Sequence, residues 1–198
     1  MIPKVIWTIW LNDKDEIPEL IQKCTKTHEV LGYERRFITL NNLPQVDSRY
    51  FKECLEAKKW VKAVDYLRIW LLNENGGIYL DADVEVLKPF GAFDAFLDNK
   101  IFACEEANGF VSNAVIGAEA KHPLLKNYLE TVDGNFIGGG SLIYQPGMFL
   151  WTEMAKQSPD VKIYPTEYFL PYNWQADTMK VTEKTVTIHY FNRSWTKK

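Results

Sequence analysis

The stretch Gly76-Gly77-Ile78-Tyr79-Leu80-Asp81-Ala82-Asp83 joins a helix end, a strand and two carboxylates within eight residues. The glycine that follows Asn75 is typical of a helix C-terminus, and the apolar run at 77–80 predicts a buried strand. Side chains two positions apart on an extended chain point the same way, so Asp81 and Asp83 can serve one site. Such carboxylates suit Mg²⁺ or Mn²⁺, which share them with substrate phosphates. Taken alone, however, the pair fits a solvated turn between strands better than a metal site.

The sequence before the glycines predicts a helix that is buried on most sides. Apolar residues recur at helical spacing from Trp60 to Leu71, and further apolar residues lie on the other faces. Asp65 and Arg68 are three positions apart and therefore share a face of this helix. Buried charges are costly unless they are paired or functional. Two interpretations stay open: a structural ion pair, and an arginine that neutralises a departing diphosphate.

Strands and helices alternate in the first half of the chain, which predicts an α/β fold with a largely parallel sheet flanked by helices. The predicted strands are 5–11, 36–40, 77–80 and 84–87, and the predicted helices start at Pro18, at Asp47 as the cap, and at Trp60. The second half is less regular, with strands at 101–104, 115–116 and 185–191, helices at 122–132 and 147–155, and a glycine loop at 138–140. The length of 198 residues suits a single domain, 1–198.

Composition excludes several classes of protein. The net charge of −3 and the lack of a basic cluster exclude a nucleic-acid partner. Three cysteines far apart in the sequence argue against a disulfide framework and indicate a reducing, cytoplasmic compartment. The N-terminus lacks the pattern of a signal peptide, and the sequence has no apolar run long enough to span a bilayer.

Four segments of the chain match the pattern of a known family. The central one is AVDYLRIWLLNENGGIYLDADVEVLKPF at 63–90, with Asp-x-x-Arg, Gly-Gly and an aromatic residue before the DxD. It resembles the core of glycosyltransferase family 32, the DxD-containing sugar transferases of the Och1-like and capsular-polysaccharide type. IPKVIWTIWLN at 2–12 is similar to the family's first strand, SNAVIGAEAKHPLL at 112–125 to its mid-chain asparagine segment, and HYFNRSW at 189–195 to its C-terminal ending. The chain departs from the family's pattern at Trp7, where many relatives have histidine, and at Asn12, where they usually have glycine.

The resemblance implies a GT-A fold of the Rossmann-like nucleotide-diphospho-sugar transferases, with Mn²⁺ or Mg²⁺ as the cofactor. The nucleotide-sugar and metal half would be 1–90, and the acceptor-side half 91–198. Asp83 would be the main metal ligand, and Asp81 would hold the metal and the donor's ribose or sugar. Asp65 and Arg68 would grip the transferred sugar, with Tyr79 behind them.

The resemblance also assigns residues at both ends of the chain. Ile9 and Trp10 would hold the base of the donor, with the indole ring stacked on it. Asn113 would contact the sugar near the bond that breaks. From the C-terminal end, His189, Ser194 and Trp195 would approach the metal and the diphosphate, with His189 as a candidate metal ligand.

The predicted function is therefore a metal-dependent, retaining transfer of a hexose from a UDP- or GDP-sugar. The acceptor would be a saccharide or a lipid-linked saccharide in cell-surface polysaccharide synthesis, with possible peripheral contact to the inner face of the membrane. One alternative is a phosphatase of the haloacid-dehalogenase type, because IYLDADV also fits that family's DxDxV strand, with Asp81 as the nucleophile. Glu105-Glu106 are the only adjacent acids downstream of that motif. The other alternative is a non-catalytic sugar-binding module that uses its many aromatic residues as platforms.

Overall fold

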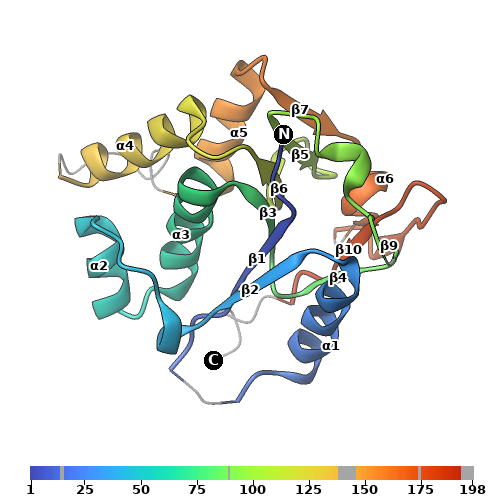
Figure 1. Ribbon diagram of the computed structural model, residues 1–198, viewed down its shortest axis with the longest axis horizontal. Coiled ribbons are helices and arrows are strands. Elements are labelled where there is room, and N and C mark those ends of the chain that lie inside the picture. The colour runs from blue at the N-terminus through green and yellow to red at the C-terminus, as the bar shows by residue number, and fades with distance from the viewer. Residues whose placement is uncertain (14–15, 89, 138–145, 174, 193–198) are drawn as a thin grey trace.

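A six-stranded sheet with helices on both faces forms the centre of the protein (Figure 1). The computed structural model describes residues 1–13, 16–88, 90–137, 146–173 and 175–192. The strand order is β2-β1-β3-β6-β5-β7, in which β6 runs antiparallel to both of its neighbours and the other strands share one direction. The predicted α/β class with a mostly parallel sheet is confirmed.

The elements follow the chain in a regular order. The strands are β1 Val5–Ile9, β2 Glu34–Ile38, β3 Gly77–Leu80, β4 Val84–Val86, β5 Ile101–Glu105, β6 Val111–Ala118, β7 Val161–Tyr164, β8 Tyr172–Asn173, β9 Thr178–Met179 and β10 Thr187–His189. The helices are α1 Glu19–Thr27, α2 Arg49–Glu56, α3 Trp60–Asn75, α4 Pro123–Ile137, α5 Met148–Gln157 and α6 Thr166–Phe169.

The turn from α3 into β3 depends on both glycines. Gly76 ends the helix with φ +66°, and its N–H donates to the Leu72 carbonyl at 2.8 Å. Gly77 has φ +108°, and a Cβ there would lie 2.7 Å from the Val5 carbonyl oxygen. Trp7 closes the turn, because its indole N–H donates to the Gly76 carbonyl at 2.8 Å. The glycine pair therefore lets the helix return directly onto the centre of the sheet.

The side chains of alternate residues in β3 pack into two separate hydrophobic cores. Tyr79 faces the core that contains α2, α3, α4 and α5, whereas Ile78 and Leu80 face the core around β4 and α6. Since side chains alternate along a strand, Asp81 lies on the same side as Tyr79 and hence toward α3. The strand thus directs its first carboxylate toward the helix that carries Asp65 and Arg68.

The last strand returns to the segment that follows β3. β10 pairs antiparallel with β4 in a separate two-stranded sheet, with His189 opposite Val84. The N–H of Tyr190 donates to the Asp83 carbonyl at 3.2 Å. This pairing carries the C-terminal region of the chain to the second aspartate of the motif.

Some predicted boundaries differ from the structure. Ser48, and not Asp47, caps α2, since its hydroxyl accepts the Phe51 N–H at 3.1 Å. β6 is longer than predicted because its whole length pairs with β3 and β5, and α4 runs on to Ile137. The glycine loop at 138–140 lies outside the described residues. Within the described part of the chain, no helix has the length and apolar character to cross a membrane. The division at residue 90 stays a prediction.

Candidate active site

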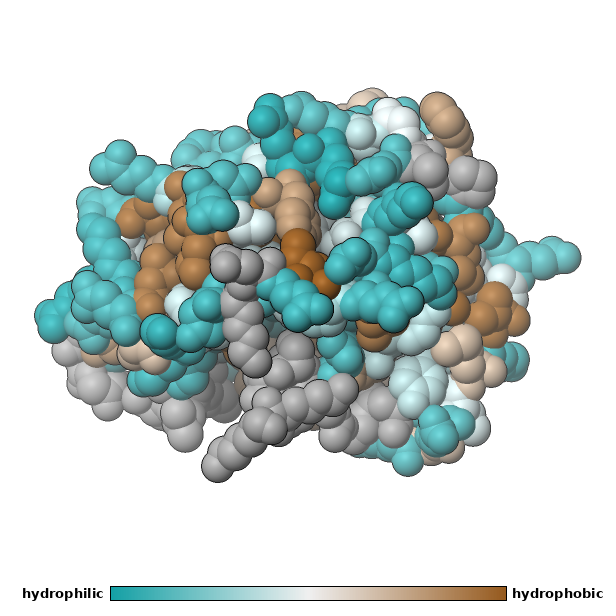
Figure 2. All heavy atoms as spheres, turned by 90° about the horizontal axis from the view of Figure 1, so that it is seen from below, coloured by the Kyte–Doolittle hydropathy of each residue, from teal (hydrophilic) through white to brown (hydrophobic). Residues whose placement is uncertain are grey.

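A pocket of about 630 Å³ opens at the carboxyl ends of β1, β3 and β5. Figure 2 views the molecule from below, the side toward which the ends of β1 and β3 point in Figure 1, and shows groups of hydrophobic residues on a largely hydrophilic face. The predicted site residues that line this pocket are Ile9, Trp10, Asp65, Arg68, Asp81, Asp83, Asn113 and His189. Tyr79 is fully buried behind them, and Ser194 and Trp195 lie outside the described residues.

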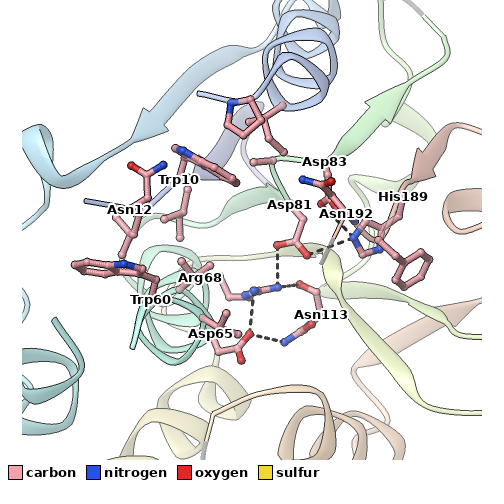
Figure 3. A pocket seen from close by; sticks show the side chains of 18 of the residues that line it. Trp10, Asn12, Trp60, Asp65, Arg68, Asp81, Asp83, Asn113, His189 and Asn192 are labelled. Atoms are coloured by element: carbon pink, nitrogen blue, oxygen red, sulfur yellow. Dashed lines mark hydrogen bonds and ion pairs between the residues drawn. The ribbon is translucent and has the colours of Figure 1, made fainter. Parts of the chain in front are cut away.

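Arg68 lies at the centre of a network of ion pairs and hydrogen bonds (Figure 3). One guanidinium nitrogen is 2.9 Å from Asp65 Oδ1, and the other is 3.2 Å from Asp81 Oδ1 and donates to the Asn113 carbonyl at 2.6 Å. The guanidinium also lies over the ring of Tyr79, 4.7 Å from its centroid, and the Tyr79 hydroxyl donates to Asp81 Oδ1 at 2.6 Å. Arg68 is only 5% exposed, so this charge is held in one orientation by α3, β3 and β6 together.

Burial and neighbouring charges shift the pKa values of both Asp65 and Arg68. Asp65 accepts a hydrogen bond from the Asn113 amide at 3.0 Å as well as the Arg68 contact. Burial raises the pKa of Asp65 above its usual value, although Arg68 and Asn113 oppose the shift. Burial alone would lower the pKa of Arg68, but Asp81, Tyr79 and Asp65 raise it, so the guanidinium stays charged.

Asp81, Asp83 and His189 form a group that could hold a metal ion. One ligand atom from each lies within 4.8 Å of the others. His189 Nε2 is 3.2 Å from Asp83 Oδ1 and 3.8 Å from Asp81 Oδ2, and the backbone N–H of Asn192 donates to Asp83 Oδ2 at 2.8 Å. Two carboxylate oxygens and an imidazole nitrogen suit Mn²⁺ and tolerate Mg²⁺ less well. The residues present therefore fit a divalent ion.

Asp83 and His189 stabilise the charged forms of each other. Burial disfavours the Asp83 carboxylate, but His189 and the Asn192 N–H overcome that effect and lower the pKa of Asp83 to about 2. Burial would also lower the pKa of His189, yet Asp83 and Asp81 raise it above its usual value. His189 Nδ1 is buried and has no hydrogen-bond partner within the described residues. The pair of aspartates thus creates a strongly negative field that a cation would neutralise.

The pocket also contains residues that sequence reasoning did not assign to it. Trp60, at the start of α3, lies on the same side of the pocket as Trp10 and Asn12 (Figure 3). Glu106 and Asn192 line the pocket as well. Burial raises the pKa of Glu106, whereas His189 lowers it. The strand order brings Glu106 to the pocket, the return of β10 brings Asn192, and α3 carries Trp60.

Two solved structures with a similar fold are named as glycosyltransferases. The chain is similar to PaToxG glycosyltransferase, with a TM-score of 0.62 and 19% identity over 79% of this chain and 69% of that one. It is also similar to a glycosyltransferase involved in glycosylation of the major capsid of PBCV-1, with a TM-score of 0.56 and 12% identity over 97% and 95% of the two chains. At these identities the likeness shows the fold.

Relatives in sequence support the same class. A protein of Acanthamoeba polyphaga mimivirus named as an uncharacterized glycosyltransferase is 29% identical over 199 residues, which cover 89% of this chain and 76% of the relative. Glucan organizing enzyme 1 of Cryptococcus neoformans var. grubii is 27% identical over 141 residues, or 65% of this chain and 36% of that protein. Fold, site and relatives together define the chain as a glycosyltransferase.

A protein-family model that matches most of the chain identifies its family. The model described as capsular polysaccharide synthesis protein matches residues 1–131, so the chain belongs to the capsular polysaccharide synthesis protein family. The predicted class of enzyme is confirmed, and the resemblance to glycosyltransferase family 32 is consistent with this match. The phosphatase and the non-catalytic binding module are not supported by these relatives.

Proposed function

We propose that the protein transfers a hexose from a nucleotide-diphosphate sugar to a saccharide or lipid-linked saccharide, with retention of configuration and with help from Mn²⁺ or Mg²⁺. The observation that carries this proposal is the contact between two groups in one pocket: the Asp81–Asp83–His189 group and the Arg68 network, which share Asp81. One group suits a cation bound to phosphate and the other suits a polar sugar. A nucleotide-diphosphate sugar requires both, side by side.

The donor would extend along the carboxyl edge of the sheet. The base would lie against Trp10 at the end of β1, and the ribose and diphosphate near Asp81 and Asp83 after β3. The sugar would lie over Asp65, Arg68 and Asn113, whose polar atoms are fixed by mutual contacts of 2.6–3.0 Å. Fixed polar groups recognise hydroxyls well because little ordering is needed on binding.

The chain's own residues contribute charge and orientation. The cation would be held by Asp81, Asp83 and His189, and when bound it would act as a Lewis acid on the diphosphate. Arg68 supplies a second positive charge beside Asp81, where negative charge grows as the bond to the sugar breaks. Asp65 Oδ1 contacts both the Arg68 guanidinium and the Asn113 amide, so this carboxylate orients those two side chains. Attack by the acceptor from the leaving-group side would then account for retention.

The proposal is tested by a thermal-shift screen of UDP- and GDP-hexoses with and without Mn²⁺ or Mg²⁺, followed by an assay of donor hydrolysis. We expect one nucleotide class to raise the melting temperature only with metal, and the same donors to be hydrolysed slowly. Asp83→Asn should abolish both effects, whereas Asp47→Asn, whose side chain is 99% exposed, should leave them unchanged. Donor binding without metal dependence and without hydrolysis would instead support a sugar-binding module.

A further inference from the structure

The turn between β5 and β6 projects polar side chains into the pocket from the side opposite Trp10. In the order β1-β3-β6-β5, the end of β1 lies on one side of β3 and the 106–110 turn lies across β6 on the other side. Neighbouring strands are about 4.8 Å apart, so the two positions are separated by roughly 14 Å. Glu106 and Asn108 line the pocket from this turn. A donor whose base is on Trp10 and whose sugar is near Asn113 does not use these two residues. Asn108 Nδ2 lies 3.4 Å from Glu106 Oε2, and Asn108 Oδ1 accepts the Phe110 N–H at 3.1 Å.

The turn is held firmly by its own hydrogen bonds. The Glu106 N–H donates to the Phe110 carbonyl at 2.7 Å, and the Gly109 N–H donates to the Glu106 carbonyl at 2.9 Å. Gly109 has φ +80°, a conformation that favours glycine. Lys156 of α5 donates to the Gly109 carbonyl at 2.7 Å. The polar side chains of the turn are therefore presented from a fixed backbone.

An exposed aromatic pair lies beside this turn. Phe149, the second residue of α5, is 59% exposed, and its ring meets that of Phe110 edge to face at a centroid distance of 5.0 Å. Its neighbour Met148 lines the pocket. A phenyl ring that remains this exposed contributes little to the core, and edge-to-face contact with Phe110 fixes its orientation.

The start of α5 is also close to the proposed sugar site. A Cβ on Gly147 would lie 3.2 Å from Asp65 Oδ2, so the backbone of this residue nearly touches the carboxylate. α5 is fastened to β6, because the Trp151 indole donates to the Ser112 carbonyl at 3.1 Å and the Val111 N–H donates to the Thr152 hydroxyl at 2.9 Å. The turn, Met148 and Asp65 thus line one corner of the pocket, and the aromatic pair lies at its edge, next to Met148 and the turn.

We propose that this corner is the acceptor subsite and that it takes a pyranose ring, with the apolar face of the ring against Phe149 and its hydroxyls bonded to Glu106 and Asn108. This inference rests on the proposed function, since it places the acceptor beside the sugar end of the donor. The chemistry favours a saccharide, because a sugar ring combines an apolar face with hydroxyls at its edge. Glu106 is a positioning residue: it accepts a hydroxyl hydrogen bond and orients the ring toward the donor sugar.

The test is saturation-transfer NMR on the full chain with the methyl glucopyranosides, galactopyranosides and mannopyranosides as probes, in the presence of diamagnetic Mg²⁺ and UDP or GDP. At least one probe should bind, with the strongest signals on its ring C–H protons. Phe149→Ala should weaken binding about three- to tenfold, the value of one aromatic contact. Glu106→Gln should weaken it about five- to tenfold through loss of a charge-assisted hydrogen bond, with the largest change in the signals of the hydroxyl-bearing positions.

Phe90→Ala is the matched control, because Phe90 is 80% exposed and its ring lies against Gly32 before β2, on the far side of β1 from the β5–β6 turn. It should leave probe binding unchanged. The acceptor inference is overturned if no pyranoside binds the wild-type chain, or if Phe149→Ala and Phe90→Ala behave alike. Metal-dependent donor hydrolysis by the wild-type chain is measured separately. Its absence contradicts the proposed function, whereas hydrolysis without pyranoside binding contradicts the acceptor subsite alone.

Discussion

Replacement of Arg68 by lysine tests whether the geometry of the guanidinium, and not only its charge, holds the centre of the site together. The two terminal nitrogens of Arg68 contact Asp65 at 2.9 Å, Asp81 at 3.2 Å and the Asn113 carbonyl at 2.6 Å. A lysine ammonium keeps the charge but is compact and cannot reproduce the planar fork. At least one charge-assisted contact is lost, and each contributes about 1.5–3 kcal/mol when buried.

We therefore expect Arg68→Lys to lower the free energy of unfolding by about 2–3 kcal/mol. For a chain of this length that corresponds to a fall in melting temperature of roughly 4–12 °C. Arg68→Met should cost more, about 3–5 kcal/mol, because it leaves Asp65 and Asp81 without a buried partner charge. Where the lysine variant is still folded, donor hydrolysis should fall about a hundredfold or more.

Urea unfolding followed by tryptophan fluorescence measures these differences. Arg49→Lys is the control: Arg49 pairs with Glu53 on the surface, its side chain is 73% exposed, and its change should stay within about 0.5 kcal/mol. If Arg68→Lys unfolds at the same urea concentration as the wild-type chain and retains donor hydrolysis, the fork geometry has no role and the network described here is refuted.

Three further predictions follow from the fold and the site. His28 is buried with its Nε2 2.8 Å from the Val84 carbonyl, and burial lowers its pKa from 6.5 to about 4. As the pH falls, the unfolded chain takes up the proton first, so about 3 kcal/mol of the stability present above pH 6.5 should be lost by pH 4 in urea titrations. The same loss in His28→Gln would contradict the assignment to His28. Gly77→Ala should destabilise the fold by about 2 kcal/mol or more in the same assay, since its Cβ would meet the Val5 carbonyl, and an unchanged midpoint would contradict the strained turn. Removal of divalent metal with EDTA should abolish the stabilisation of the wild-type chain by nucleotide, whereas Asp83→Asn should show no difference with or without EDTA.

The part of the fold that sequence reasoning predicted best is the part specified locally. α3 and β3 have the predicted limits because helical apolar spacing, a glycine pair and a four-residue apolar run lie next to one another. The cap of α2 was misplaced by one residue because Asp47 and Ser48 are both good caps, and only the Phe51 N–H in the structure distinguishes them. β6 was predicted too short because its pairing with two neighbours, and not its own composition, sets its length.

The site, like the fold, contains residues that local sequence patterns specify and residues that only the tertiary structure brings in. Asp65, Arg68 and Asp81 could be grouped from the sequence because helix spacing and strand alternation determine where they point. Glu106 reaches the pocket only through the order of the strands, so it could not be assigned to the site before the fold was known. Trp60 lies two helical turns before Arg68 on α3, so the spacing along the helix was a signal for it that sequence reasoning did not use.

The pairing of β10 with β4 has a consequence for the order in which the site is assembled. Asp65, Arg68 and Asp81 lie within a short helix–turn–strand segment, whose contacts close small loops and are expected to form early. His189 and Asn192 reach Asp83 only when the far end of the chain returns, across a separation of 109 residues in the case of Asn192. On a growing chain the sugar-binding cluster would therefore be complete well before the metal group. A bound cation would then stabilise the docked state of the last strand, so cation affinity becomes a measure of whether folding has finished.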